Sequence, residues 1–84
     1  MEDRIKKNID LLNEANKQGM LPMLYLSLIS SDSLIDEGSC DKSIEMLTDF
    51  LEALPKTDIE DKEKWKDMFN AGLGIVKRDK KNFK

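Results

Sequence analysis

Apolar residues recur at intervals of three and four along most of this chain, the spacing that places side chains on one face of an α-helix. Residues 2–18 show this spacing first, in a stripe formed by Ile5, Ile9, Leu12 and Ala15. Gly19 follows, where a left-handed residue can end a helix. The pattern predicts an amphipathic helix over residues 2–18.

A second helix is predicted over residues 22–37. Pro22 suits the first turn of a helix, because the N–H that proline lacks would be unpaired there, and Gly38 follows the segment. Residues 23–29 are apolar nearly all round and could also form a strand. No neighbouring segment alternates as a partner strand would, and helical spacing continues across Ser30, Ser31 and Asp32, so we expect a helix.

The third predicted helix has two opposite faces. It takes Ser39 or Asp41 as its N-cap and ends before Pro55. One face carries Ile44, Leu47, Phe50, Leu51 and Leu54. The other carries four carboxylates, those of Asp41, Glu45, Asp49 and Glu52. We call this second face the acidic stripe.

The fourth predicted helix begins at a capping-box pattern, in which Thr57 and Glu60 can each accept a backbone N–H. Its apolar stripe consists of Trp65, Met68, Phe69, Leu73 and Val76. We expect the aromatic part of this stripe to be internal, with a recognition hot spot at Trp65, Met68 and Phe69 as the alternative. A glycine inside a helix costs about 1 kcal/mol relative to alanine, so Gly72 and Gly74 indicate a close neighbour, a bend or an early end.

These segments predict an all-α fold. Short connections make sequential helices antiparallel neighbours, so we expect a four-helix antiparallel array or bundle. Residues 1–76 would form a single domain, since 84 residues are too few for two. Residues 77–84 would be a basic, frayed C-terminal tail.

Residues 22–55 carry a further pattern: small residues at Ser31 and Ser43, leucines at positions 34 and 47, glycine at the turn and proline at the end. This pattern resembles one tetratricopeptide-type helical hairpin of about 34 residues. The aromatic expected early in the first helix is Ser27 here, and Phe50 replaces a small alanine. The resemblance implies tetratricopeptide-like hairpins, while a closed four-helix bundle remains the alternative.

Composition narrows the possible functions. Histidine is absent, which removes the side chain that most often does acid–base work near neutral pH. A lone cysteine, Cys40, fits a reducing compartment, so we expect a cytoplasmic protein. Residues 20–29 are too short a run to span a membrane, and no signal peptide is visible. The excess of lysine over arginine hints at an AT-rich bacterial or phage genome.

Enzyme signatures are missing from the sequence. No GxSxG, P-loop or GxGxxG motif occurs, and an EF-hand register on Gly38 would place Ile44 where the bidentate glutamate belongs. We therefore expect neither an enzyme, nor a cofactor, nor a metal site.

The acidic stripe and the second helix are the candidate partner-binding features. The acidic stripe is either a solvated helix face or a docking site for a protein with a basic surface; repulsion between carboxylates four residues apart within a helix favours docking. Apolar contact is expected from Met23, Tyr25 and Leu26. We predict a small, acidic, non-enzymatic interaction module that acts as an adaptor, a chaperone-like subunit or an inhibitor occluding a partner protein.

A nucleic-acid-associated regulator or a dimeric structural subunit is the alternative. Its phosphate contacts would come from the basic tail residues Lys77, Arg78, Lys80, Lys81 and Lys84. A sequence pI near 4.9 makes nucleic acid the weaker prediction. The apolar second helix also allows a homodimer.

Overall fold

The structure, a computed structural model, describes residues 3–30 and 34–83. Within these ranges the chain forms four α-helices, one short 3₁₀-helix and no strand, so the all-α prediction is confirmed. The elements are α1 (Asp3–Lys17), α2 (Leu21–Ile29), α3 (Glu37–Ala53), η1 (Leu54–Lys56) and α4 (Lys62–Lys81).

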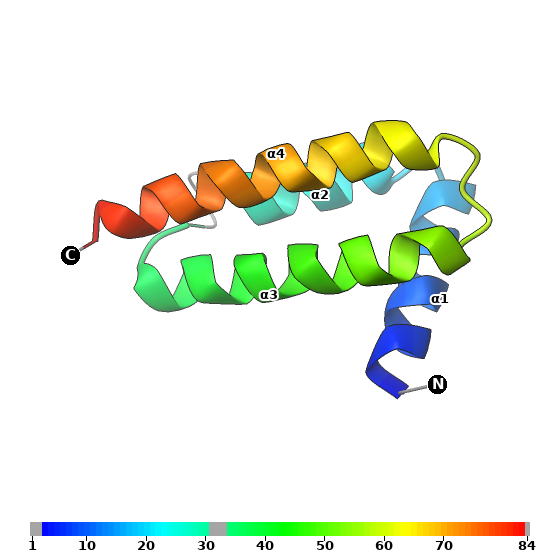
Figure 1. Ribbon diagram of the computed structural model, residues 1–84, viewed down its shortest axis with the longest axis horizontal. Coiled ribbons are helices and arrows are strands. Elements are labelled where there is room, and N and C mark those ends of the chain that lie inside the picture. The colour runs from blue at the N-terminus through cyan, green and yellow to red at the C-terminus, as the bar shows by residue number, and fades with distance from the viewer. Residues whose placement is uncertain (1–2, 31–33, 84) are drawn as a thin grey trace.

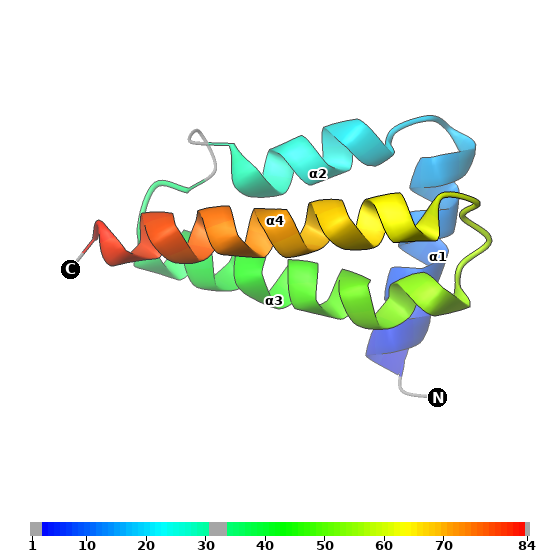
Figure 2. The same cartoon turned by 45° about the horizontal axis from the view of Figure 1, so that its top comes forward.

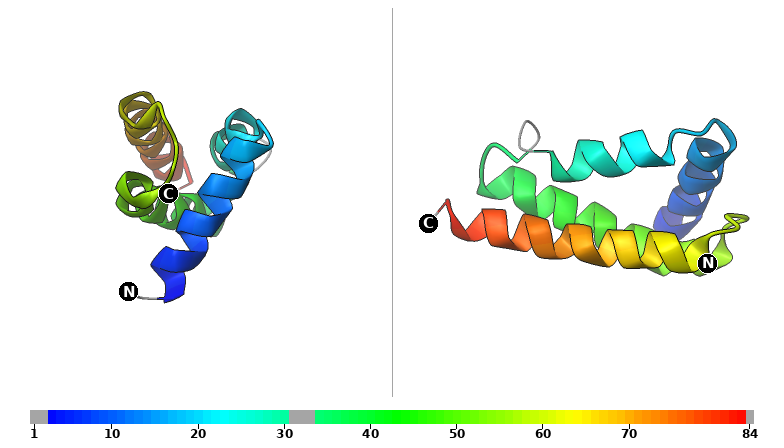
Figure 3. Two further views of the ribbon diagram at one scale, coloured as in Figure 1. Left: turned by 90° about the vertical axis from the view of Figure 1, so that its right-hand side faces the viewer. Right: turned by 90° about the horizontal axis from the view of Figure 1, so that it is seen from above.

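Three of the helices lie side by side, and the fourth crosses them. α3 and α4 are long antiparallel neighbours, and α2 lies beside α4 and runs in the same direction (Figures 1 and 2). α1 crosses the other helices steeply at one end of the bundle, where it packs mainly on α3 (Figure 3). The sequence therefore predicted the helical bundle, but the crossing of α1 differs from the expected antiparallel array.

The core is centred on the aromatic ring of Phe69 in α4. Its centroid lies 5.8 Å from those of Phe50 and Trp65 and 6.1 Å from that of Tyr25. The largest fully buried side chains are Phe50, Phe69, Leu12, Leu47, Val76 and Cys40. Three helices thus meet in one aromatic cluster, and the expectation that Trp65 and Phe69 are internal is confirmed.

The end of α1 follows the sequence prediction. Gly19 has a φ of 69°, a left-handed conformation that costs glycine little because it lacks a Cβ. The Met20 N–H then donates to the Ala15 carbonyl at 2.7 Å, which satisfies a carbonyl that the helix end leaves open. The predicted start at Glu2 lies outside the described residues.

The boundary between α2 and α3 corrects the prediction. α2 ends at Ile29 instead of reaching residue 37, and Ser30 is already extended with ψ at 141°. The continuation through Ser31 and Asp32 lies outside the described residues. α3 begins earlier than expected, because the Asp36 carboxylate accepts the Ser39 N–H at 2.7 Å and caps the helix there.

The start of α4 is a second correction. The predicted capping box does not form, because the Thr57 hydroxyl is buried and donates to the Leu54 carbonyl at 2.7 Å. This bond closes η1 rather than opening a helix. Ile59 is buried in the connection, and the Asp58 N–H donates to the Asn13 side chain at 2.8 Å. These contacts hold the connection against the bundle, and α4 starts only at Lys62.

The far end of α4 carries the basic residues expected to fray. The helix continues through them to Lys81, and the backbone N–H groups of Asn82 and Phe83 bond back to its last turn. Lys84 lies outside the described residues.

Candidate protein-interaction surfaces

The acidic stripe on α3 is partly neutralised from α1. Arg4 places one guanidinium nitrogen 3.7 Å from the Asp49 carboxylate and another 3.8 Å from that of Glu52. Asp49 is also mostly buried, with a side chain only 12% exposed. Two of the four carboxylates therefore lie beside a cation of the same chain, although the Glu52 side chain is still 53% exposed.

The opposite end of the stripe is tied to α4. The Lys80 ammonium lies 2.6 Å from the Asp41 carboxylate. This hydrogen bond, together with the charge of Asp41, raises the pKa of Lys80 above its ordinary value. Glu45 is exposed and forms no ion pair among the residues that the structure describes. Charge recognition by the stripe stays a prediction, and Glu45 is its best-placed member.

An uncharged apolar surface lies on α2 and just before it. Met20, Met23 and Leu26 are 43%, 64% and 56% exposed, and we call these three residues the α2 apolar surface. They are exposed because the opposite side of α2 is directed into the core, through Leu21, Tyr25 and Leu28. Residues 18–31 carry no charge, in a chain of which 37% of residues are charged. Two of the residues expected to make apolar contacts, Met23 and Leu26, are thus accessible.

Tyr25 does not belong to this surface, which corrects the expectation that it contacts a partner. Only 8% of it is exposed, and its ring packs against Trp65 in an edge-on contact with the centroids 6.4 Å apart. A Cβ added at Gly72 would lie 3.0 Å from the Tyr25 ring. The close approach of Tyr25 accounts for the glycine at position 72, which in the sequence indicated a close neighbour without identifying it.

Cys40 lies in the core near the start of α3. Burial, and then the negative charges of Asp79, Asp41 and Asp36, raise the pKa of its thiol. A buried neutral thiol is a poor nucleophile, so Cys40 acts as a core side chain.

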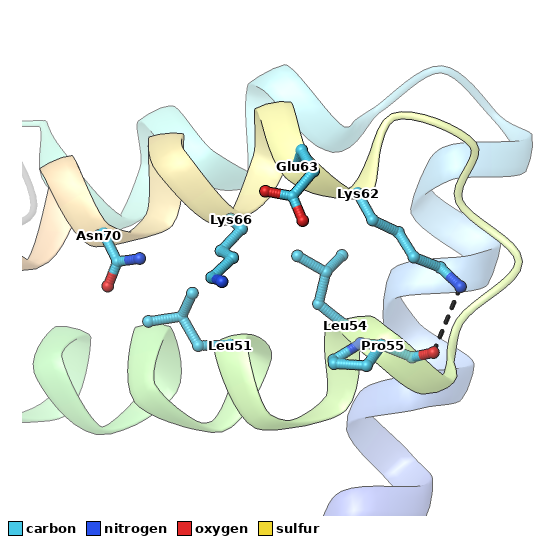
Figure 4. A pocket seen from close by; sticks show the side chains of 7 residues that line it. All are labelled: Leu51, Leu54, Pro55, Lys62, Glu63, Lys66 and Asn70. Atoms are coloured by element: carbon cyan, nitrogen blue, oxygen red, sulfur yellow. Dashed lines mark hydrogen bonds between the residues drawn. The ribbon is translucent and has the colours of Figure 1, made fainter.

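Sequence reasoning missed an open cavity between α3 and α4. It has a volume of about 360 Å³ and lies beside η1 and the first half of α4 (Figure 4). Its lining consists of Leu51, Leu54, Pro55, Lys62, Glu63, Lys66 and Asn70, and we call it the α3/α4 cavity. The spacing of four between Lys62, Lys66 and Asn70 was the available signal, but only the packing of α3 shows that these residues face an apolar wall.

Acidic side chains lie among the basic residues at the C-terminal end of α4. Lys77, Lys80 and Lys81 surround a second open cavity of about 470 Å³ together with Glu37, Asp41 and Ile44. The arrangement is not a uniformly basic patch.

Metal-binding clusters and membrane-spanning helices are both absent from the described ranges. Residues 3–30 and 34–83 contain no group of three or more acidic, cysteine or histidine side chains arranged to hold a metal ion. No described helix combines the length and the apolar character needed to cross a lipid bilayer.

Fold and surfaces together define a small all-α helical bundle that carries an uncharged apolar surface on α2. Comparison with protein-family models, with curated proteins and with solved structures gives no match to this chain.

Proposed function

We propose that this protein is a small acidic module for protein–protein recognition without catalytic activity of its own. The observation that carries the proposal is the α2 apolar surface, where Met20, Met23 and Leu26 are all more than 40% exposed on an uncharged segment. Contiguous exposed apolar residues are uncommon on folded proteins and often mark a contact site. An adaptor, a chaperone-like subunit or an inhibitor that occludes its partner would use such a surface.

The size of the surface fits reversible binding. Full burial of a large apolar side chain contributes about 1.5–3 kcal/mol, so three half-exposed side chains contribute roughly 2–5 kcal/mol before the entropic cost of association. A partner must therefore add contacts around this centre. Glu45 is the exposed acid that a basic rim on the partner would contact, which keeps a protein with a basic surface as the proposed partner.

The tetratricopeptide-type resemblance adds little support. Its first helix would be α2, which has only nine residues, and α2 packs more on α4 than on α3. We therefore favour recognition by a closed helical bundle. A cytoplasmic location is retained as part of the proposal, since the single thiol of Cys40 is buried and has no cysteine to pair with.

The test compares apolar-to-lysine substitutions at two places on the surface. Met23→Lys combined with Leu26→Lys puts charge on the α2 apolar surface, while Leu11→Lys changes a 41% exposed leucine on α1. Affinity capture from lysate of the source cell should recover a partner with the natural protein and with Leu11→Lys, and lose it with the double variant. Circular dichroism must show equal helix content for all three.

Crosslinking then locates the contact. A photoreactive amino acid at position 23 should capture the same partner, and one at position 11 should not. Retention of the partner by the double variant would refute the proposal. Light scattering over a concentration series distinguishes an external partner from a homodimer, in which the captured protein is a second copy of this chain.

The competing proposal is a nucleic-acid-associated regulator that uses the basic end of α4. It has less support, because Lys80 is paired with Asp41 and Glu37 lies in the same cavity lining. A phosphate binder would lose affinity for DNA or RNA steeply as salt rises.

A further inference from the structure

The α3/α4 cavity has two chemically different walls. Leu51, Leu54 and Pro55 come from the end of α3 and from η1, and Lys62, Glu63, Lys66 and Asn70 come from α4. Figure 4 shows the Lys66 and Asn70 side chains extending from α4 toward Leu51. A ligand in this space would contact an apolar surface on one side and charged groups on the other.

The apolar wall consists of hydrocarbon side chains, those of Leu51, Leu54 and Pro55. Leu54 is 2% exposed and forms the floor, and Pro55 has no backbone N–H. The carbonyl of Pro55 accepts a hydrogen bond from the Lys62 ammonium at 3.2 Å, drawn as a dashed line in Figure 4. This wall therefore suits a hydrocarbon body.

The polar wall favours one negative charge. Lys62, Lys66 and Asn70 are four residues apart and lie on one side of α4. Lys62 is held by Pro55, whereas Lys66 has neither a hydrogen bond nor an ion pair within the described residues. Its ammonium and the Asn70 amide can both donate to an anion. Glu63 lines the same space and would repel a second negative charge.

We propose that the α3/α4 cavity binds a small amphipathic monoanion, with a carboxylate at Lys66 and Asn70 and an apolar body against Leu51, Leu54 and Pro55. The volume of about 360 Å³ lies at the lower end of the range of about 300–1,000 Å³ found for small-molecule sites. A dianion is disfavoured by Glu63, and a cation by the two lysines. This site is separate from the α2 apolar surface and does not depend on the proposed recognition function.

The probe is decanoate, and its control is decyltrimethylammonium, which has the opposite charge and an apolar tail only one carbon longer. Each is added to the full chain below the concentration at which it forms micelles, and methyl signals are followed by two-dimensional NMR. Decanoate should shift the methyl signals of Leu51 and Leu54 in a saturable way. The methyls of Leu26 and Leu11, which are exposed elsewhere, report non-specific adsorption.

Two variants on the polar wall should act in opposite directions. Lys66→Gln should weaken decanoate binding by about tenfold, because it removes the charge that the carboxylate contacts. Glu63→Gln should tighten binding by severalfold, because it removes the repelling charge. Lys7→Gln on α1 is the matched control and should leave the dissociation constant unchanged.

Three results would overturn the proposal. They are the absence of a saturable shift at Leu51 and Leu54, an equal response to the cationic probe, and a Lys66→Gln affinity equal to that of Lys7→Gln. Because Lys66 and Glu63 are both exposed, neither substitution removes a core contact, and unchanged circular dichroism confirms that the fold is retained.

Discussion

The two glycines of α4 allow a direct test of the packing between α2 and α4. Gly72 is buried, and a Cβ placed on it would meet the Tyr25 ring at 3.0 Å and the Ile29 side chain at 3.2 Å. Gly74 is exposed, and a Cβ there would meet nothing within 4 Å. Substitution by alanine therefore adds the same methyl group to one helix at two positions. At position 72 the methyl meets α2, and at position 74 it meets nothing.

The expected stabilities follow from two opposing effects. Replacing a helical glycine with alanine stabilises the folded state by about 0.5–1 kcal/mol at either position. At Gly72 the added methyl must displace Tyr25, which the rings of Trp65 and Phe69 hold in place, and overpacking of this kind costs about 1–3 kcal/mol. Gly74→Ala should raise the free energy of unfolding by about 0.5–1 kcal/mol, and Gly72→Ala should lower it by about 0–2.5 kcal/mol.

Urea denaturation followed by circular dichroism at 222 nm measures both variants against the natural protein. A thermal scan should give the same order, because each kcal/mol shifts the midpoint by about 4–8 °C in a domain of this size. If Gly72→Ala stabilises the protein as much as Gly74→Ala does, the close approach of Tyr25 is wrong, and so is the internal placement of that residue.

Three further predictions concern caps, charges and the thiol. The hydrogen bond from the Ser39 N–H lowers the pKa of Asp36 below its ordinary 3.8. The cap therefore stabilises the fold above pH 3.8, and this stabilisation is lost as the pH falls through the lowered pKa. The difference in melting temperature between the natural protein and Asp36→Ala should accordingly disappear in acid. Arg4→Gln should lower the free energy of unfolding by about 1 kcal/mol at low salt and by less at 1 M salt, whereas Lys7→Gln should have no effect; equal losses would refute the role of Arg4. Cys40 should react with a thiol reagent only after urea unfolding, and rapid reaction in buffer would contradict its burial.

Much of the local structure could be predicted from residue spacing. The apolar stripes of α1, α3 and α4 repeat at helical intervals, and the left-handed conformation open to Gly19 is enough to end α1. Both features could be predicted because they depend only on residues within one or two helical turns. The helix boundaries that were predicted wrongly depend on which of several polar side chains forms the capping hydrogen bond. Asp36 caps α3 in place of Ser39 or Asp41, and Thr57 bonds backward to Leu54 instead of forward into α4.

The candidate surfaces were less predictable for a related reason. The sequence identified the acidic stripe, but Arg4 reaches Asp49 and Glu52 only because α1 crosses α3. It also predicted apolar contacts from Met23, Leu26 and Tyr25, of which Tyr25 lies on the buried side of α2.

The sequence by itself determined that this protein is helical and acidic and carries no GxSxG, P-loop or GxGxxG motif, since composition and periodicity are properties of short segments. Only the tertiary structure decided that Tyr25 is internal, that Met23 and Leu26 are accessible and that an apolar wall faces Lys66 across a cavity. The physical reason is that exposure and charge pairing depend on which helices become neighbours, and that choice is made by the packing of the whole core.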